Sequence, residues 1–141
     1  MTRWTRWFPI DDPALRSTFR GFGIYHIRLV DARGQAVPVP RLAASDPSGT
    51  IYLGRSGTGG SRTVAKRVSE FMGGPHSGGR RWAKVSKVLK RRRALPGVAL
   101  QVRAMLGPQS VERAEAAELR RYFNRFAELP PCNSSDPGYG K

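Results

Sequence analysis

Alternation of apolar and polar side chains in three segments of the chain predicts three strands. Residues 23–30 place their odd-numbered side chains, Tyr25 among them, on one face of a strand. Residues 50–53 form a second apolar run, which we expect beside the first as its antiparallel neighbour, and residues 98–102 alternate as a third. The proline-rich stretch 36–48 between the first two strands predicts a long loop.

Apolar side chains at helical spacing in three other segments predict three helices. The first follows Ser61 or Thr63, either of which can cap it, and ends before the glycine-rich stretch 73–79. The second covers residues 80–93 and is strongly basic, and the third follows Ser110. The expected buried stripe of the third helix consists of four side chains: Ala116, Leu119, Phe123 and Phe126.

The order strand, strand, helix, helix, strand, helix predicts an α+β fold with a small three-stranded sheet, mixed or antiparallel, flanked by helices. The length of 141 residues suits one domain with a real core. We place this domain at residues 21–133, after a basic, aromatic extension over residues 1–20 and before a flexible tail over residues 134–141. In the extension, Trp4 and Trp7 are expected to pack on the domain, and base stacking is the alternative.

The charge of the chain changes this picture, because 25 lysines and arginines outnumber 10 acidic residues and give a net charge of +15. Such an excess favours a polyanionic partner, namely nucleic acid, although solubility alone is the simpler explanation. A membrane surface is disfavoured because the basic residues are spread along the chain, and no apolar run approaches the ~20 residues of a membrane span. Cys132 is the only cysteine, so no internal disulfide can form, and we expect a cytoplasmic protein.

Five short motifs occur in an order that resembles the GIY-YIG nuclease superfamily over residues 21–133. The second signature reads Tyr-Leu-Gly, which is a mild departure from the family pattern. The motifs are, in chain order, Gly23-Ile24-Tyr25, Tyr52-Leu53-Gly54, Arg67, Glu118 and the closing Pro130-Pro131-Cys132-Asn133. The resemblance implies the same α+β fold, with the two tyrosine signatures on adjacent strands, and hydrolysis of phosphodiester bonds.

The resemblance also implies roles for the tyrosines and the arginine. Tyr52 takes the general-base role and Tyr25 an orienting one, although a free phenol with a pKa of ~10 is a weak base unless a nearby cation lowers that value. Arg67 would hold phosphate oxygens in two-pronged fashion, with Arg62 as the runner-up.

The carboxylate of Glu118 is the expected metal ligand, with Glu115 one turn earlier as the competing choice. A lone carboxylate suits Mg²⁺, or Mn²⁺ in its place, because Mg²⁺ keeps much of its water shell and takes phosphate oxygens as further ligands. Many family members carry a histidine or tyrosine one turn after the arginine, where this chain has Phe71. His76 in the following loop is the candidate that folds back to replace it.

Substrate contacts are expected from Gly54, whose missing side chain would let the backbone approach the substrate, and from the basic helix. Asn133 is expected mainly to tie the chain end to the sheet. The remaining expected substrate contacts are basic: Arg55, Arg80, Arg81, Lys84 and Lys87.

Taken together, these features predict a magnesium-dependent DNA endonuclease that forms a homodimer when both strands are cut. The first alternative is a catalytically inactive nucleic-acid-binding module on the same fold, favoured by Phe71 and by the lengthened spacings between motifs. The second is a basic structural or RNA-associated protein in which the resemblance is accidental.

Overall fold

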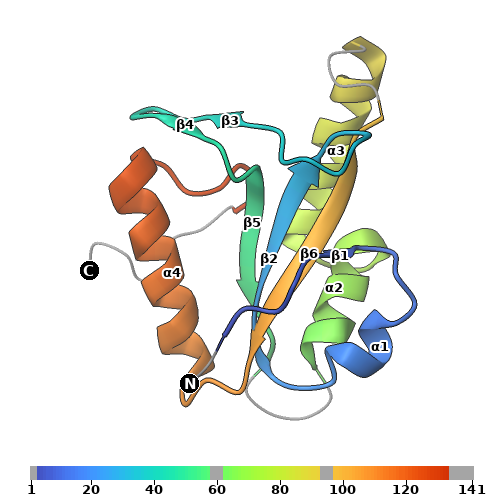
Figure 1. The fold of residues 1–141 in the computed structure, drawn as a ribbon, viewed down its shortest axis with the longest axis vertical. Coiled ribbons are helices and arrows are strands. Elements are labelled where there is room, and N and C mark those ends of the chain that lie inside the picture. The colour runs from blue at the N-terminus through green and yellow to red at the C-terminus, as the bar shows by residue number, and fades with distance from the viewer. Residues whose placement is uncertain (1–2, 58–61, 93–96, 134–141) are drawn as a thin grey trace.

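The computed structural model describes residues 3–57, 62–92 and 97–133, and shows an α+β domain built on one antiparallel sheet (Figure 1). The strand order is β1-β6-β2-β5. The three long strands are β2 (Gly23–Val30), β5 (Thr50–Arg55) and β6 (Ala99–Leu106), and β5 forms one edge of the sheet. The sheet therefore has four strands rather than the expected three, because the short β1 (Phe8–Pro9) pairs with the outer edge of β6.

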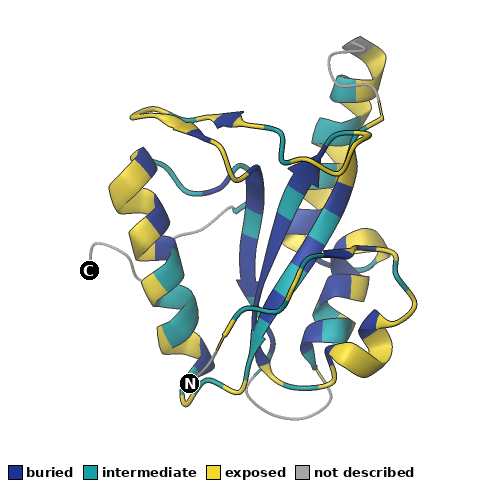
Figure 2. Ribbon diagram, in the orientation of Figure 1, coloured by how far each residue is buried: buried dark blue, intermediate teal, exposed yellow. Residues whose placement is uncertain are grey.

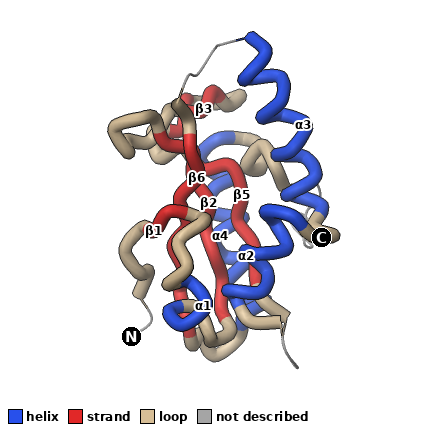
Figure 3. Tube along the Cα trace, turned by 90° about the vertical axis from the view of Figure 1, so that its right-hand side faces the viewer, coloured by secondary structure: helices blue, strands red, loops and turns tan. Residues whose placement is uncertain are grey.

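Helices cover both faces of this sheet (Figures 1 and 3). α2 (Val64–Gly73) and α3 (Ser77–Arg92) lie on one side together with the single turn α1 (Leu15–Thr18). α4 (Val111–Phe126) lies on the other side, next to β5. In Figure 3, α2 and α3 stand in front of the strands and α4 behind them.

Two clusters of apolar side chains fix this arrangement, and Figure 2 shows that the buried residues follow the sheet and the inner faces of the helices. The larger cluster joins β2 and β6 to α2 through residues such as Tyr25, Val102 and Val68. The smaller one joins Leu53 of β5 to α4. Its α4 members are Leu119, Tyr122 and Phe126, so Tyr122 takes the buried position that we expected for Phe123, which is exposed.

The segment 3–20, expected as an extension before the domain, contributes to the main core. Its four buried side chains in that cluster are Phe8, Ile10, Leu15 and Phe19. Trp4 and Trp7 pack against His26 of β2, with ring centroids 5.8 and 4.8 Å from the imidazole, as expected for packing on the domain.

Local hydrogen bonds explain where two of the helices begin. The hydroxyl of Thr63 accepts the backbone N–H of Lys66 at 3.2 Å, and that of Ser110 accepts the N–H of Arg113 at 3.3 Å, so both predicted caps are confirmed. The expected loop 36–48 contains a separate two-stranded ribbon, β3 (Val39–Pro40) with β4 (Ser45–Asp46). The expected tail 134–141 lies outside the described residues.

Among the helices that the structure describes, none is both long and apolar enough to cross a lipid bilayer.

Candidate active site

The two signature tyrosines lie on the same face of the sheet because of the pairing between β2 and β5. Tyr25 stands opposite Gly54, and Tyr52 stands two residues before Gly54 on the same strand. The two rings have centroids 5.9 Å apart. A Cβ atom on Gly54 would lie 2.7 Å from Cζ of Tyr25 and 2.5 Å from Cε2 of Tyr52. The space above Gly54 is therefore filled by the phenols, and the expectation that substrate approaches the backbone there is wrong.

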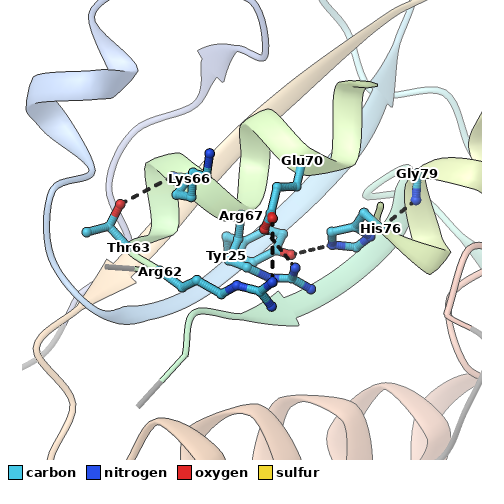
Figure 4. A network of polar contacts seen from close by, with 8 residues as sticks. All are labelled: Tyr25, Arg62, Thr63, Lys66, Arg67, Glu70, His76 and Gly79. Carbon is cyan, nitrogen blue, oxygen red and sulfur yellow. Dashed lines mark hydrogen bonds and ion pairs between the residues drawn. The ribbon is translucent and has the colours of Figure 1, made fainter. Parts of the chain in front are cut away.

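His76 reaches the first of these tyrosines from the loop between α2 and α3. Its Nε2 lies 2.8 Å from the Tyr25 hydroxyl, and its Nδ1 accepts the backbone N–H of Gly79 at 3.3 Å (Figure 4). The His76 carbonyl accepts the N–H of Arg80 at 2.9 Å, so this residue directly precedes α3, which begins at Ser77, three residues before the expected start of that helix. The prediction that His76 folds back toward the site is confirmed.

The hydrogen bond between His76 and Gly79 determines which nitrogen of His76 carries the proton, and hence which group donates in the contact with Tyr25. Burial, reinforced by Arg67, lowers the pKa of His76 to about 4, so its ring is neutral at pH 7. Because a backbone N–H can only donate, Nδ1 carries the lone pair and Nε2 carries the proton that is donated to Tyr25. The Tyr25 hydroxyl is then free to donate its own proton toward Tyr52.

The two phenols consequently differ in how well they support a negative charge. Burial raises the pKa of both tyrosines, and for Tyr25 it does so strongly because that side chain is fully buried. For Tyr52, the negative charge of Glu115 adds to the effect of burial on the pKa, whereas the positive charge of Arg67 and the hydrogen bond from Tyr25 oppose it. Tyr52 is therefore the phenol of the pair that ionises more readily.

Arg67 is held in place by Glu70 one turn further along α2. Its Nη1 lies 2.9 Å from Oε1 of Glu70, and Nη2 of Arg62 lies 3.8 Å from Oε2 of the same carboxylate. Figure 4 shows both guanidinium groups gathered below Glu70 and beside the Tyr25 hydroxyl. Arg67 lowers the pKa of Glu70 through this hydrogen bond, which keeps the carboxylate charged and the guanidinium oriented.

An open cavity of about 260 Å³, the tyrosine pocket, lies in front of these groups. It brings three guanidinium groups, one phenol and one carboxylate together. Its lining consists of Tyr52, Arg55, Ser56, Gly57, Arg62, Arg67 and Glu115.

The carboxylate in this pocket is Glu115 and not Glu118. Oε1 of Glu115 lies 3.4 Å from Nε of Arg55, and burial raises the pKa of Glu115 against the influence of that arginine. Glu118 instead lines a different cavity and holds Arg121 at 2.6 Å, so the expectation that it meets the tyrosines is wrong. Residues three apart point about 60° apart on a helix, and the packing of α4 on Leu53 turns the earlier of the two toward Tyr52.

The other expected contact residues lie in three different places. Arg55 lines the tyrosine pocket. Asn133 accepts the N–H of Leu53 at 3.0 Å and donates to its carbonyl at 2.9 Å, which confirms that it ties the chain end to β5. The basic side chains expected to contact substrate lie exposed on α3, outside the described lining of the pocket: Arg80, Arg81, Lys84 and Lys87.

Two glycines at the start of α3 belong to the site although the sequence indicated only a break there. A Cβ on Gly78 would lie 2.6 Å from Cε1 of Tyr52, and one on Gly79 would lie 2.0 Å from the carbonyl oxygen of Phe71. The pair lets α3 approach both the base candidate and α2. Phe71 itself packs on Tyr52 and His76, with ring centroids 5.4 and 5.2 Å away.

The described residues contain no group of three or more histidine, cysteine or acidic side chains that could hold a metal ion. A metal ion held by one carboxylate, which Glu115 could provide, does not require such a group. Comparisons of the chain with models of known protein families, with curated proteins and with solved structures found no match.

Proposed function

We propose that this protein is a metal-dependent endonuclease that hydrolyses DNA phosphodiester bonds in the tyrosine pocket. The observation that supports this best is the convergence of Tyr52, Arg67 and Glu115 on one cavity from three separate elements. A base, cations for phosphoryl oxygens and a carboxylate for a metal ion are the groups that this reaction needs. The net charge of +15 suits the polyanionic substrate.

Each residue has a distinct task in the proposed mechanism. Tyr52 acts as its phenolate, which forms when the hydroxyl releases its proton to solvent and which Tyr25, oriented by His76, stabilises with its own hydrogen bond. The phenolate oxygen then takes a proton from the attacking water and becomes the neutral phenol. Arg67, kept in position by Glu70, binds the phosphoryl oxygens on which negative charge develops. Arg55 and Arg62 extend the positive lining toward the flanking phosphates.

A divalent cation, Mg²⁺ or Mn²⁺, fits the chemistry of Glu115. The pKa of this carboxyl group is raised by burial, which means that Arg55 does not fully compensate its charge. A cation beside it would favour the ionised form, and Mg²⁺ is commonly held by one or two carboxylates together with substrate phosphates. When bound, it supplies neutralisation of charge on the phosphoryl and leaving oxygens.

A pair of matched substitutions on α4 tests this assignment. Glu115→Gln is expected to abolish Mg²⁺-dependent nicking of a supercoiled plasmid, with a loss of about 10²-fold or more, because it removes the carboxylate without changing the size of the side chain. Glu118→Gln makes the same charge change one turn further along α4, and this variant is expected to nick plasmid as fast as the parent protein. Nicked and linear products are separated on a gel, and DNA binding is measured alongside.

Equal activity in the parent and the Glu115→Gln variant would refute the assignment. A parent protein that binds DNA and never nicks it, with either cation, would favour the inactive nucleic-acid-binding module. That alternative has one specific observation behind it, namely that burial raises the pKa of Tyr52 despite Arg67. Binding and nicking restricted to RNA would instead favour the second alternative, an RNA-associated protein.

One such centre cuts one strand, so linear product without accumulation of the nicked form would indicate a homodimer. The same proposal places the protein with DNA in the cytoplasm, at the nucleoid if the source is bacterial.

A further inference from the structure

A second cavity, the Arg103 pocket, lies on the opposite face of the sheet from the tyrosine pocket. It has a volume of about 230 Å³ and opens between α4 and the side of β2, β5 and β6 that faces this helix. Its lining combines a buried polar wall, an apolar floor and a rim of arginines. The residues are His26, Asp46, Ser48, Thr50, Leu53, Arg103, Glu118, Arg121, Tyr122, Arg125 and Phe126.

Arg103 is a fixed cation that makes no ion pair within 4.0 Å in the described part of the chain. Its guanidinium carbon lies 4.5 Å from the ring centroid of Trp4 and 4.7 Å from that of Trp7, and its Nε donates to Nδ1 of His26 at 3.2 Å. Burial lowers the pKa of this guanidinium although the negative charge of Glu118 opposes the shift, which indicates a partly desolvated cation whose charge is only partly compensated. An anion in the pocket would supply that compensation.

The polar side chains behind Arg103 already hydrogen-bond to one another, so this wall of the pocket is formed before any ligand binds. Because Nδ1 of His26 accepts from Arg103, Nε2 donates to the Thr50 hydroxyl at 2.6 Å. That hydroxyl lies 2.7 Å from the Ser48 hydroxyl, which donates to Asp46 at 2.6 Å. The other carboxylate oxygen of Asp46 accepts the hydroxyl of Tyr122 at 2.8 Å. No rearrangement of this network is required before a ligand can bind.

The rim and the floor define which ligand fits. Arg121 and Arg125 of α4 line the cavity with Arg103. Arg121 is 70% exposed and binds Glu118 through Nη1, so its remaining donors can reach a ligand. Leu53 and Phe126 provide an apolar floor for a flat ring. The volume lies below the ~300–1,000 Å³ typical of pockets for drug-sized ligands, so the cavity can hold one flat ring while the rest of the ligand lies at the arginine rim.

We propose that the Arg103 pocket binds a single nucleotide, with the base on Leu53 and Phe126 and the phosphate on Arg103, Arg121 and Arg125. The nucleotide can come from a nucleic-acid strand or from solution, since both present the same base and phosphate. This proposal does not depend on cleavage in the tyrosine pocket.

The test is calorimetric titration of the full chain with AMP, inorganic phosphate, adenosine and a short single-stranded DNA. Arg121→Ala combined with Arg125→Ala removes two rim cations and leaves the stacked Arg103 in place. The matched control is Arg113→Ala combined with Arg120→Ala, which makes the same charge change on exposed positions of the same helix outside the pocket. AMP affinity is expected to fall about tenfold or more in the rim variant and to stay within about twofold of the parent in the control.

The four ligands separate the possible sources. AMP binding more tightly than both phosphate and adenosine supports a free nucleotide as ligand. DNA binding that is lost in the rim variant, without AMP binding, supports a base presented by a strand. The proposal is overturned if both double variants lose affinity equally, because that result reflects net charge, or if neither AMP nor DNA responds to the rim substitutions.

Discussion

A single imidazole connects the start of the basic helix α3 to the buried phenol of the candidate site. One nitrogen of His76 accepts a backbone N–H of α3, and the other donates to Tyr25. Any shift of α3 on binding a polyanion would therefore act on the hydrogen bond from Tyr25 to Tyr52. Close packing around Tyr52 makes this link stiff, because Gly54 and Gly78 lie against its ring where a methyl group would clash.

Gly54→Ala tests how tightly the two phenols are held. The new methyl would lie within 2.8 Å of atoms of both tyrosines, so the rings must move. We expect a loss of about 1–3 kcal/mol in the free energy of unfolding and a loss of plasmid nicking. Urea denaturation measures the first and the nicking assay the second.

Gly73→Ala is the control for this substitution, since a methyl there meets no atom within 4 Å and Gly73 lies in the last turn of α2. It is expected to be neutral or to stabilise by up to about 1 kcal/mol. A Gly54→Ala variant as stable and as active as the Gly73→Ala variant would show that the tyrosine rings are not constrained by the glycine.

Among the elements, those with a long periodic pattern were predictable from sequence and those fixed by tertiary contacts were not. The alternation in β2 and the caps Thr63 and Ser110 are local signals, and each is confirmed. The two-residue strand β1 is too short to alternate, and only its pairing with β6 defines it. The prediction placed Glu118 in the tyrosine pocket, where the structure has Glu115, for a similar reason. The rotation of α4 about its axis is set by its packing on Leu53, which the sequence pattern does not define.

The basic side chains of α3 form one exposed face, because the opposite face carries Trp82, Val85 and Leu89, which are partly buried. If this face binds phosphates, Lys84→Ala combined with Lys87→Ala should weaken DNA binding without regard to sequence. The slope of log K against log salt should become shallower by about 0.9 for each phosphate contact removed. Fluorescence anisotropy at several salt concentrations measures this slope.

Arg113→Ala combined with Arg120→Ala removes the same charge from α4 and serves as the control for α3. Its slope is expected to stay close to that of the parent. Equal changes in the two double variants would mean that the net charge, and not the position of α3, governs binding.

At the scale of the whole molecule, the sheet separates the tyrosine pocket from the Arg103 pocket. A buried histidine lies beside each: His76, which contacts Tyr25, and His26, which lines the Arg103 pocket. Burial, reinforced by Arg103 and Arg28, lowers the pKa of His26 to about 3, and burial with Arg67 lowers that of His76 to about 4. Both lie on β2 or contact it, so their protonation affects the centre of the fold.

These two pKa values predict how stability depends on pH. Between pH ~6.5 and the folded values, the unfolded chain binds protons that the folded chain does not, so the free energy of unfolding falls as the pH falls. Each histidine contributes up to about 1.4 kcal/mol per pH unit within this window. Urea denaturation at pH 7.5, 6 and 5 should therefore show a decline that begins near pH 6.5.

The two carboxyl groups with a shifted pKa, Glu70 and Glu115, do not produce this decline. The pKa of Glu70 is lowered by Arg67, so its contribution to stability is lost only below its ordinary range, and the raised pKa of Glu115 acts in the opposite direction. A His76→Gln variant removes one of the two titrating groups, and its slope between pH 6 and 5 should be about half that of the parent. A free energy of unfolding that stays constant from pH 7.5 to 5 would mean that neither imidazole is kept neutral by burial, and the proton assigned to Nε2 of His76 would lose its basis.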